Sequence, residues 1–238
     1  EEGKVAAAVL AKRGSIERAI RWIVRAFKQG GRLFYVGAGT SGRLGVLDAS
    51  ECPPTFRAAP DQVQGIIAGC QKALWTSVEG AEDDAAAGGR AIRFRRVKRA
   101  DVVIGIAASR RTPFVWGALG AAARRGARTI LVCFNPSLKT RRGHPPDLVI
   151  APAIGPEVLT GSTRLKAGTA TKLILNLFTT LSMIRLGKVI SNLMVDLNPA
   201  NAKLRDRAAR IVQELTVAEH AEARAALEPL LEHLGGAI

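Results

Sequence analysis

The stretch that decides the fold is Arg32-Leu33-Phe34-Tyr35-Val36-Gly37-Ala38-Gly39-Thr40-Ser41-Gly42-Arg43-Leu44-Gly45, continuing to Asp48-Ala49-Ser50-Glu51-Cys52-Pro53-Pro54. An apolar run stops at a glycine, and a loop of small and hydroxyl residues follows. An amphipathic run comes next and is closed by the double proline. This order predicts a strand, a loop of the size that holds a phosphate, a helix, and a rigid turn that carries an acid, Glu51.

Further apolar runs on both sides of this unit predict an α/β fold. The expected strands are residues 33–36, 63–67, 102–106, 129–133 and 148–150. The expected helices are residues 4–29, broken at Gly14-Ser15 with Ser15 as N-cap, and residues 72–77, 83–91, 113–125, 161–187, 200–214 and 217–234. Because strands and helices alternate with short turns, we expect a parallel sheet sandwiched between helices. We expect this domain over residues 1–198, including the N-terminal helices, and a small C-terminal helical appendage over residues 199–238.

The composition is that of an ordered globular chain. Of its 238 residues, 47% are hydrophobic and 23% are charged, and no run approaches the roughly 18 apolar residues of a membrane span. The first residues, Glu1-Glu2-Gly3-Lys4, lack the apolar segment of a signal peptide. The cysteines, Cys52, Cys70 and Cys133, are odd in number and widely spaced, so we interpret each as a buried small apolar residue. These features favour a cytoplasmic location.

The net charge of +15 is concentrated in three clusters, residues 93–99, 124–128 and 139–142. Each cluster lies in a connection next to a predicted strand, and few aromatic residues are interleaved with the basic ones. We therefore interpret the clusters as an arginine-rich solvated surface. General attraction of anionic substrates is the next interpretation, and nucleic-acid binding is unlikely despite the basic charge.

The glycine loop matches the Gly-x-Gly-x-x-Gly fingerprint of dinucleotide sites at Gly37, Gly39 and Gly42. A nicotinamide site also needs an acid at the end of the second strand, and that strand ends in Ile67-Ala68-Gly69. The loop instead carries two hydroxyls, Thr40 and Ser41, beside the N–H groups of a helix start. That chemistry favours one phosphate monoester over a dinucleotide or a purely structural turn.

A second loop of the same kind, Ala107-Ala108-Ser109-Arg110-Arg111-Thr112-Pro113, follows the expected strand 102–106. The carboxyl ends of parallel strands share one edge of the sheet, which is where open α/β folds bind ligands. We expect both loops to meet there.

Two acids stand out by their position, Glu51 beside the double proline and Glu82 beside a glycine turn. Paired carboxylates near a sugar phosphate can serve as general acid and general base, whereas we interpret Glu79, Asp83 and Asp84 as solvated or capping residues. Lys166, near the start of a predicted helix, opposes the helix dipole there, which favours a role with an anion or a partner subunit.

At these residues the sequence resembles the N-acetylmuramic acid 6-phosphate etherases, a family related to the glucokinase regulatory protein. The resemblance runs in order from about residue 30 to 212. It is carried by the segments 37–55, 64–69, 78–83, 155–169 and 187–196. It implies the sugar isomerase (SIS) fold, a sugar 6-phosphate substrate, a homodimer, and neither metal nor nucleotide cofactor.

The resemblance also implies the reaction and the residues that carry it. The D-lactyl ether at C3 of the sugar is removed by elimination and water then adds, giving N-acetylglucosamine 6-phosphate and D-lactate. The family's acid corresponds to Glu51 and its base to Glu82. Its phosphate contacts correspond to Thr40, Ser41, Ser109, Arg111 and Thr112, to which we add Gly39, Gly42, Arg110 and Lys166 as candidate substrate-binding residues.

One departure concerns the second loop, which reads Ser-Gly-Arg-Thr in the family and has Arg110 in place of that glycine here. Arg110 either adds a cation to the phosphate site or obstructs a loop that needs a positive φ. Two other functions stay open, a non-catalytic sugar-phosphate sensor and an SIS-type aldose–ketose isomerase.

Overall fold

In the computed structural model, which describes residues 1–136, 145–199, 201–216 and 218–235, a five-stranded parallel sheet has the order β2-β1-β3-β4-β5. The strands are β1 (Leu33–Gly37), β2 (Val63–Ile67), β3 (Val102–Ile106), β4 (Arg128–Val132) and β5 (Leu148–Ile150). Each run that was predicted to be a strand forms one, and β1, β3 and the end of β4 are buried on both faces. The predicted α/β fold is confirmed.

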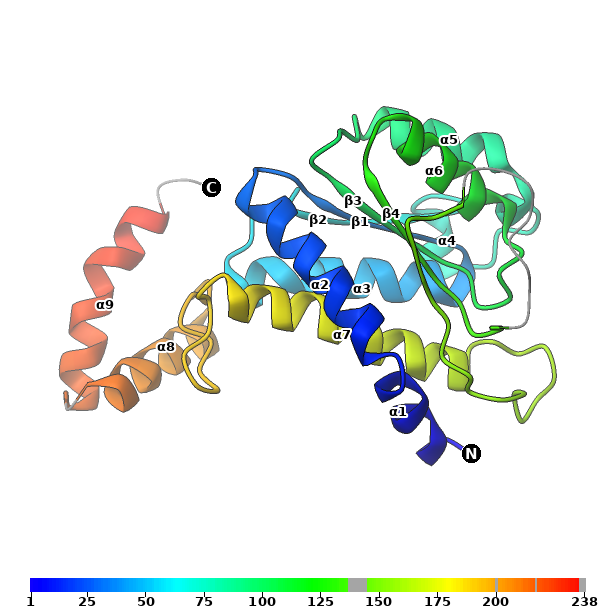
Figure 1. The fold of residues 1–238 in the computed structure, drawn as a ribbon. Helices are drawn as coiled ribbons and strands as arrows, with labels where there is room; N and C mark the ends of the chain where they lie inside the picture. The colour runs from blue at the N-terminus through cyan, green and yellow to red at the C-terminus, as the bar shows by residue number, and fades with distance from the viewer. Residues whose placement is uncertain (137–144, 200, 217, 236–238) are drawn as a thin grey trace. The chain divides into compact units, whose positions relative to one another are not determined.

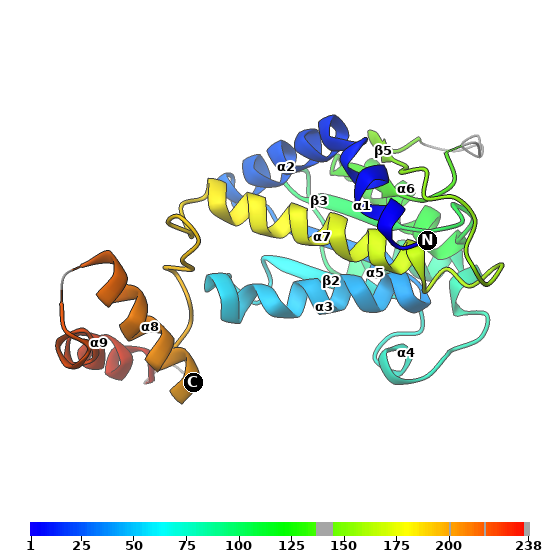
Figure 2. The ribbon, with the colours of Figure 1, turned by 90° about the horizontal axis from the view of Figure 1, so that it is seen from below.

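Helices cover both faces of this sheet (Figures 1 and 2). One face carries α2 (Arg13–Lys28), α3 (Gly39–Phe56) and α7 (Lys166–Arg185), and the other carries α5 (Ala85–Phe94) and α6 (Pro113–Arg124). The remaining elements are α1 (Gly3–Leu10), α4 (Lys72–Trp75), the short 3-10 helix η1 (Ala81–Asp83), α8 (Ala202–Leu215) and α9 (His220–Gly235). In Figure 2 the helices α2, α7 and α3 lie side by side and cover this face of the sheet.

The chain divides into two compact units. The first comprises Glu1–Ser50 and Pro60–Ser182 and contains the sheet; the second comprises Glu51–Ala59 and Met183–Ile238. Within the second unit, Leu197, Ala208 and Ile211 form a small buried cluster. Asn201 caps α8 by accepting a hydrogen bond from Leu204 N at 2.9 Å. The boundary expected at residues 198 and 199 stays a prediction.

Two buried carboxylates tie the elements of the first unit together. Asp101 accepts bonds from the backbone N–H groups of Arg32 and Lys98 and from Arg32 Nη2, each at 2.9 Å, which joins the amino ends of β1 and β3. Asp48 on α3 accepts from the hydroxyls of Tyr35 on β1 (2.9 Å) and Thr179 on α7 (3.2 Å). Burial raises the pKa of the Asp48 carboxyl, and the Tyr35 hydrogen bond opposes this rise.

Several of the predicted helix ends are wrong, beginning with the break in the N-terminal helical segment. The break after α1 falls at Ala11 and Lys12, and Gly14 and Ser15 lie inside α2. Nothing lies within 4 Å of a Cβ placed on Gly14, so this exposed glycine costs only about 1 kcal/mol of helix propensity. Burial of Ile16, Ile20 and Ile23 offsets that cost.

The double proline does not close α3, because Pro53 and Pro54 lie inside the helix, which ends at Phe56. Each proline lacks a backbone N–H, so the helix loses only these two hydrogen-bond donors close to its end. The carbonyls of the last turn accept bonds from other parts of the chain. Asn198 N donates to Pro54 O at 3.3 Å and Lys188 Nζ donates to Phe56 O at 2.8 Å. The basic cluster at 139–142 lies outside the described residues.

Candidate active site

The glycine loop makes the tight strand-to-helix turn that the sequence predicts. A Cβ on Gly37 would lie 2.6 Å from Gly42 N, and one on Gly42 would lie 2.6 Å from Ile67 Cγ1. Gly39 has φ +51°, a conformation that glycine adopts without steric cost. Because the first N–H groups of a helix have no intrahelical acceptor, the start of α3 offers backbone donors to an anion.

The chain that follows β2 turns back onto this loop and encloses a cavity of about 150 Å³. Gly39 and Arg43 line one side, and the segment from Ser77 to Glu82 lines the other. The structure therefore brings together two of the predicted site residues, Gly39 and Glu82. Thr40 and Ser41 are half-buried in the first turn of α3. Thr40 faces α7, with its Cγ2 3.7 Å from the position of a Cβ on Gly168.

Arg43 is a residue that our sequence reasoning did not select. Its Nε donates to Leu74 O at 3.2 Å and its Nη2 donates to Thr76 O at 3.3 Å. Arg43 thus holds the segment leading to Ser77–Glu82 against α3 while its side chain lines the cavity. The available signal was a single arginine inside the glycine-rich stretch.

Glu82 lies in η1, a short helix that begins directly after Gly80. The positive φ of Gly80, +72°, makes the turn into this helix. Glu82 is exposed, and it lines the cavity. Glu79 lines the same cavity and accepts a bond from Ser77 Oγ at 2.9 Å.

Asp84 has a structural role. It accepts from Ala87 N at 2.7 Å, which caps α5, and from Arg90 Nη2 at 2.9 Å. The backbone hydrogen bond from Ala87, helped by Arg90, lowers the pKa of Asp84. The interpretation of Asp84 as a capping residue is confirmed.

Glu51 is an exposed residue within α3, which corrects the expectation that it follows this helix. The cause is the continuation of α3 through the two prolines. The pairing of Glu51 with Glu82 in one site stays a prediction.

The second loop follows β3, the neighbour of β1, and Gly37 and Ile106 are in register at the carboxyl ends of the two strands. Both loops therefore lie at the same edge of the sheet. Ser109 and Arg111 are exposed, and Thr112 precedes Pro113, the first residue of α6.

Arg110 has φ +62°, so the position that is glycine in the resembled family does require a positive φ here. Trp116 Nε1 donates to Arg110 O at 3.0 Å and holds this strained backbone. The positive charge of Arg110 also reaches Cys133 at the end of β4. It lowers the pKa of that thiol, against the stronger rise caused by burial.

Lys166 is buried at the start of α7. Its Nζ donates to Glu1 Oε2 at 2.7 Å. Both oxygens of Glu157 accept backbone bonds, from Lys166 N and from Ala167 N, each at 2.9 Å. This carboxylate caps α7, so the helix begins at Lys166 and not at residue 161 as predicted. A role of Lys166 with substrate stays a prediction.

Cys52 and Cys133 are buried, as expected, but Cys70 is exposed. It lies in the turn after β2 with φ +56°, so its interpretation as a buried residue is wrong. Within the described residues, no three His, Cys, Asp or Glu side chains are grouped to hold a metal ion. The described helices also include none with the length and apolarity to cross a membrane.

Comparisons with known proteins identify relatives over most of the chain. The family model for the glucokinase regulatory protein N-terminal SIS domain matches residues 15–123. N-acetylmuramic acid 6-phosphate etherase of Gloeobacter violaceus is 55% identical over 228 residues, which cover 96% of this chain and 74% of that protein. The enzyme of the same name from Rhizobium rhizogenes is 55% identical over 214 residues, covering 90% of this chain and 69% of that protein.

A solved structure with a similar fold is a phosphoheptose isomerase from Francisella tularensis. It has a TM-score of 0.54 and 14% identity, and the match covers 75% of this chain and 94% of that one. At this identity the likeness concerns the fold alone.

Proposed function

Because the chain belongs to the N-acetylmuramic acid 6-phosphate etherase family, we propose that it cleaves the D-lactyl ether of N-acetylmuramic acid 6-phosphate. The chain is a carbon–oxygen lyase, and its products are N-acetylglucosamine 6-phosphate and D-lactate. The observation that carries the proposal is its identity to curated etherases over nearly all of its length. The placement of Glu82 and the glycine loop around one cavity supports it.

The reaction begins with the open-chain aldehyde of the sugar, in which the C2 proton is acidified by the neighbouring carbonyl. In our proposal the Glu82 carboxylate removes this proton, and the C3–O bond breaks as electrons move into a C2–C3 double bond. Glu51 protonates the departing lactate oxygen. Water then adds at C3 and a proton returns to C2, so one water is consumed for each lactate released.

The remaining candidate residues hold the phosphate in this proposal. The N–H groups at the start of α3 and the hydroxyls of Thr40 and Ser41 supply donors from the first loop. Ser109, Arg110, Arg111 and Thr112 supply donors and positive charge from the second loop. We further propose that the protein is a cytoplasmic homodimer.

Release of D-lactate from N-acetylmuramic acid 6-phosphate tests the function. The Glu82→Gln variant is expected to lower kcat by about 10²- to 10⁴-fold, the usual contribution of a general base. Glu79→Gln is the matched control, since Glu79 lines the same cavity, and it is expected to keep kcat within about threefold of the wild-type value.

Each alternative gives a different result. Wild-type turnover by Glu82→Gln rejects Glu82 as the base. Saturable binding of the substrate without lactate release identifies a sensor, and a ketose product that retains the lactyl group identifies an isomerase.

A further inference from the structure

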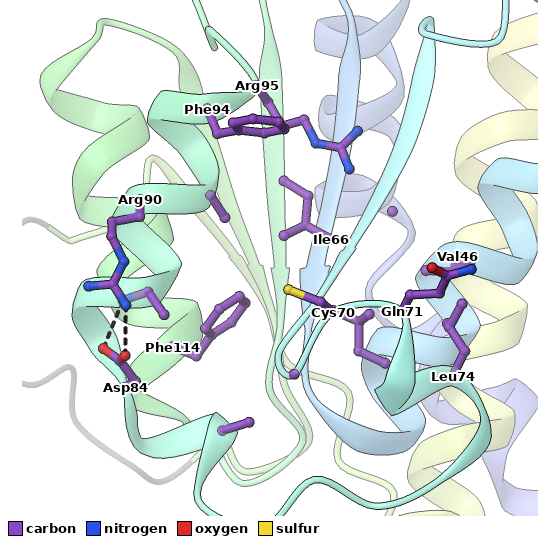
Figure 3. Close-up of a pocket in the computed structure, with 16 residues that line it drawn as sticks. Val46, Ile66, Cys70, Gln71, Leu74, Asp84, Arg90, Phe94, Arg95 and Phe114 are labelled. Atoms are coloured by element: carbon purple, nitrogen blue, oxygen red, sulfur yellow. Dashed lines mark hydrogen bonds and ion pairs between the residues drawn. The ribbon is translucent and has the colours of Figure 1, made fainter.

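A second and larger cavity, of about 700 Å³, lies on the α5 side of β2 (Figure 3). Arg90 and Phe114 stand on one side of it and Gln71 and Leu74 on the other, with Ile66 of the edge strand between them. The lining is mostly apolar, and its volume is that of a typical small-molecule site. None of the residues predicted to bind substrate lines it.

The charges of this cavity do not balance. The charged residues among its described lining are Asp84, Arg90 and Arg95. Asp84 and Arg90 neutralise each other as an ion pair at 2.9 Å. Arg95 Nη1 donates to the neutral Gln64 Oε1 at 2.6 Å. One positive charge is therefore left over at an apolar cavity. Beside it lies the ring of Phe94, a side chain that is 83% exposed.

We propose that this cavity binds a small amphipathic anion, its apolar body packed between α5 and the segment Cys70–Leu74 and its acidic group held by Arg95. Charge complementarity favours this occupant, because Arg95 is a cation at the cavity that no acid among the described lining residues neutralises. The size of the cavity suits a medium-length acyl chain or an aromatic acid.

The position of the cavity couples it to the candidate active site. Ala81 lines both cavities, Glu82 lines the small one and Asp84 lines the large one. An anion that attracts Arg95 and Arg90 competes with Asp84, the cap of α5, and so acts on η1, which carries Glu82. We therefore expect occupancy to change the rate of lactate release. This second step rests on the proposed function, whereas the binding step does not.

Cys70 provides a direct measure of occupancy. It is an exposed cysteine that lines the cavity, and its sulfur points into it in Figure 3. Cys52 and Cys133 are buried and serve as internal references. The test measures the rate at which N-ethylmaleimide modifies Cys70, by mass spectrometry of the peptides, with the whole chain in its native state.

The probes separate the two parts of the ligand. Decanoate is expected to slow the alkylation of Cys70 at least about fivefold at saturation, in a dose-dependent manner. Decanol has the chain without the charge and acetate the charge without the chain, and neither is expected to protect at the same concentration. Equal protection by decanol overturns the anionic class, and no protection by decanoate overturns the site.

Two variants and a matched control test the location. Arg95→Gln is expected to raise the decanoate concentration for half-protection about tenfold, whereas Arg93→Gln, which removes the same charge outside the cavity lining, leaves it unchanged. Ala91→Phe fills the cavity and is expected to abolish protection. Equal effects of Arg95→Gln and Arg93→Gln overturn the assignment of Arg95, even if Ala91→Phe does not fold.

The remaining measurements test whether the cavity is coupled to the active site and whether a second copy of the chain covers it. Saturating decanoate is expected to change kcat/KM for lactate release at least about threefold in the wild-type protein and in Arg93→Gln but not in Ala91→Phe. Protection of Cys70 with unchanged kinetics overturns the coupling. Absence of lactate release without any ligand instead rejects the proposed function and leaves the binding result standing. If protection of Cys70 rises with protein concentration alone, a second copy covers the cavity and the small-anion proposal is wrong.

Discussion

Replacing Arg43 by methionine tests how the cavity around Glu82 is held together. The substitution keeps most of the side-chain volume and removes the two bonds to Leu74 O and Thr76 O. A hydrogen bond from a charged donor contributes about 1.5–3 kcal/mol. The bond to Leu74 O is only partly buried and the bond to Thr76 O is exposed, so we take a contribution of about 1 kcal/mol for each bond. The loss of about 2 kcal/mol corresponds to about a 30-fold change in the equilibrium that orders residues 74–82.

We therefore expect kcat/KM for lactate release to fall by as much as about 30-fold in Arg43→Met. Amide hydrogen exchange in residues 76–82 is expected to accelerate, while exchange in β1 and β3 stays unchanged. Arg43→Lys keeps the charge but cannot form the same fork of bonds. Arg21→Met, on the exposed side of α2, controls for loss of a surface arginine.

Two results would refute this reasoning. An unchanged kcat/KM in Arg43→Met shows that the two bonds do not order the segment. Full recovery in Arg43→Lys with fast exchange still present shows that Arg43 acts through its charge on the substrate and not through the position of Glu82.

Three further predictions concern stability and binding. Asp101→Asn is expected to lower the free energy of unfolding by about 3 kcal/mol in urea titrations, because it leaves the buried Arg32 contacts without a carboxylate, and an unchanged midpoint contradicts it. Burial raises the pKa of the Asp48 carboxyl above its ordinary 3.8, so the folded chain holds this proton more tightly than the unfolded one. The stability of the wild type relative to Asp48→Asn should therefore fall as the pH rises from about 3.8 and then stay constant; the opposite slope rejects the burial argument. Arg110→Gly removes the strain of a positive φ, which costs about 1 kcal/mol, and is expected to raise the melting temperature while raising KM about tenfold. A KM equal to that of the wild type shows that Arg110 does not bind substrate.

The strands were predictable from the sequence because most contain a continuous apolar run, although β2 includes Gln64 and β4 begins with Arg128 and Thr129. β2, β3 and β5 have the predicted bounds. Helix ends were less predictable, since they depend on partners far along the chain. The end of α3 is an example, because Pro54 O accepts a bond from Asn198 N and Phe56 O accepts one from Lys188 Nζ. Local propensity at the two prolines contains no information about those donors.

The candidate site was predictable in part. The glycine loop and Glu82 belong to segments that follow neighbouring strands, and parallel pairing brings such segments to one edge. The buried side chain of Lys166 donates to Glu1, and Glu157 caps the start of α7. Glu1 lies at the other end of the chain, so this contact appears only in three dimensions. Arg43 was missed for the same reason, since its acceptors are backbone oxygens that a sequence does not place.

The connection between β2 and α5 stores backbone strain that stability alone does not require. Gly69, Cys70 and Gly80 all have positive φ, and for Cys70 this conformation costs about 1 kcal/mol or more. The path of this connection carries the chain past two cavities, and Ala81 lines both of them. The strain at Cys70 is therefore best explained as a cost of the path that places Glu82 opposite Gly39. Because Cys70 has this strained backbone and also lines the large cavity, a ligand there contacts the same connection that carries Glu82.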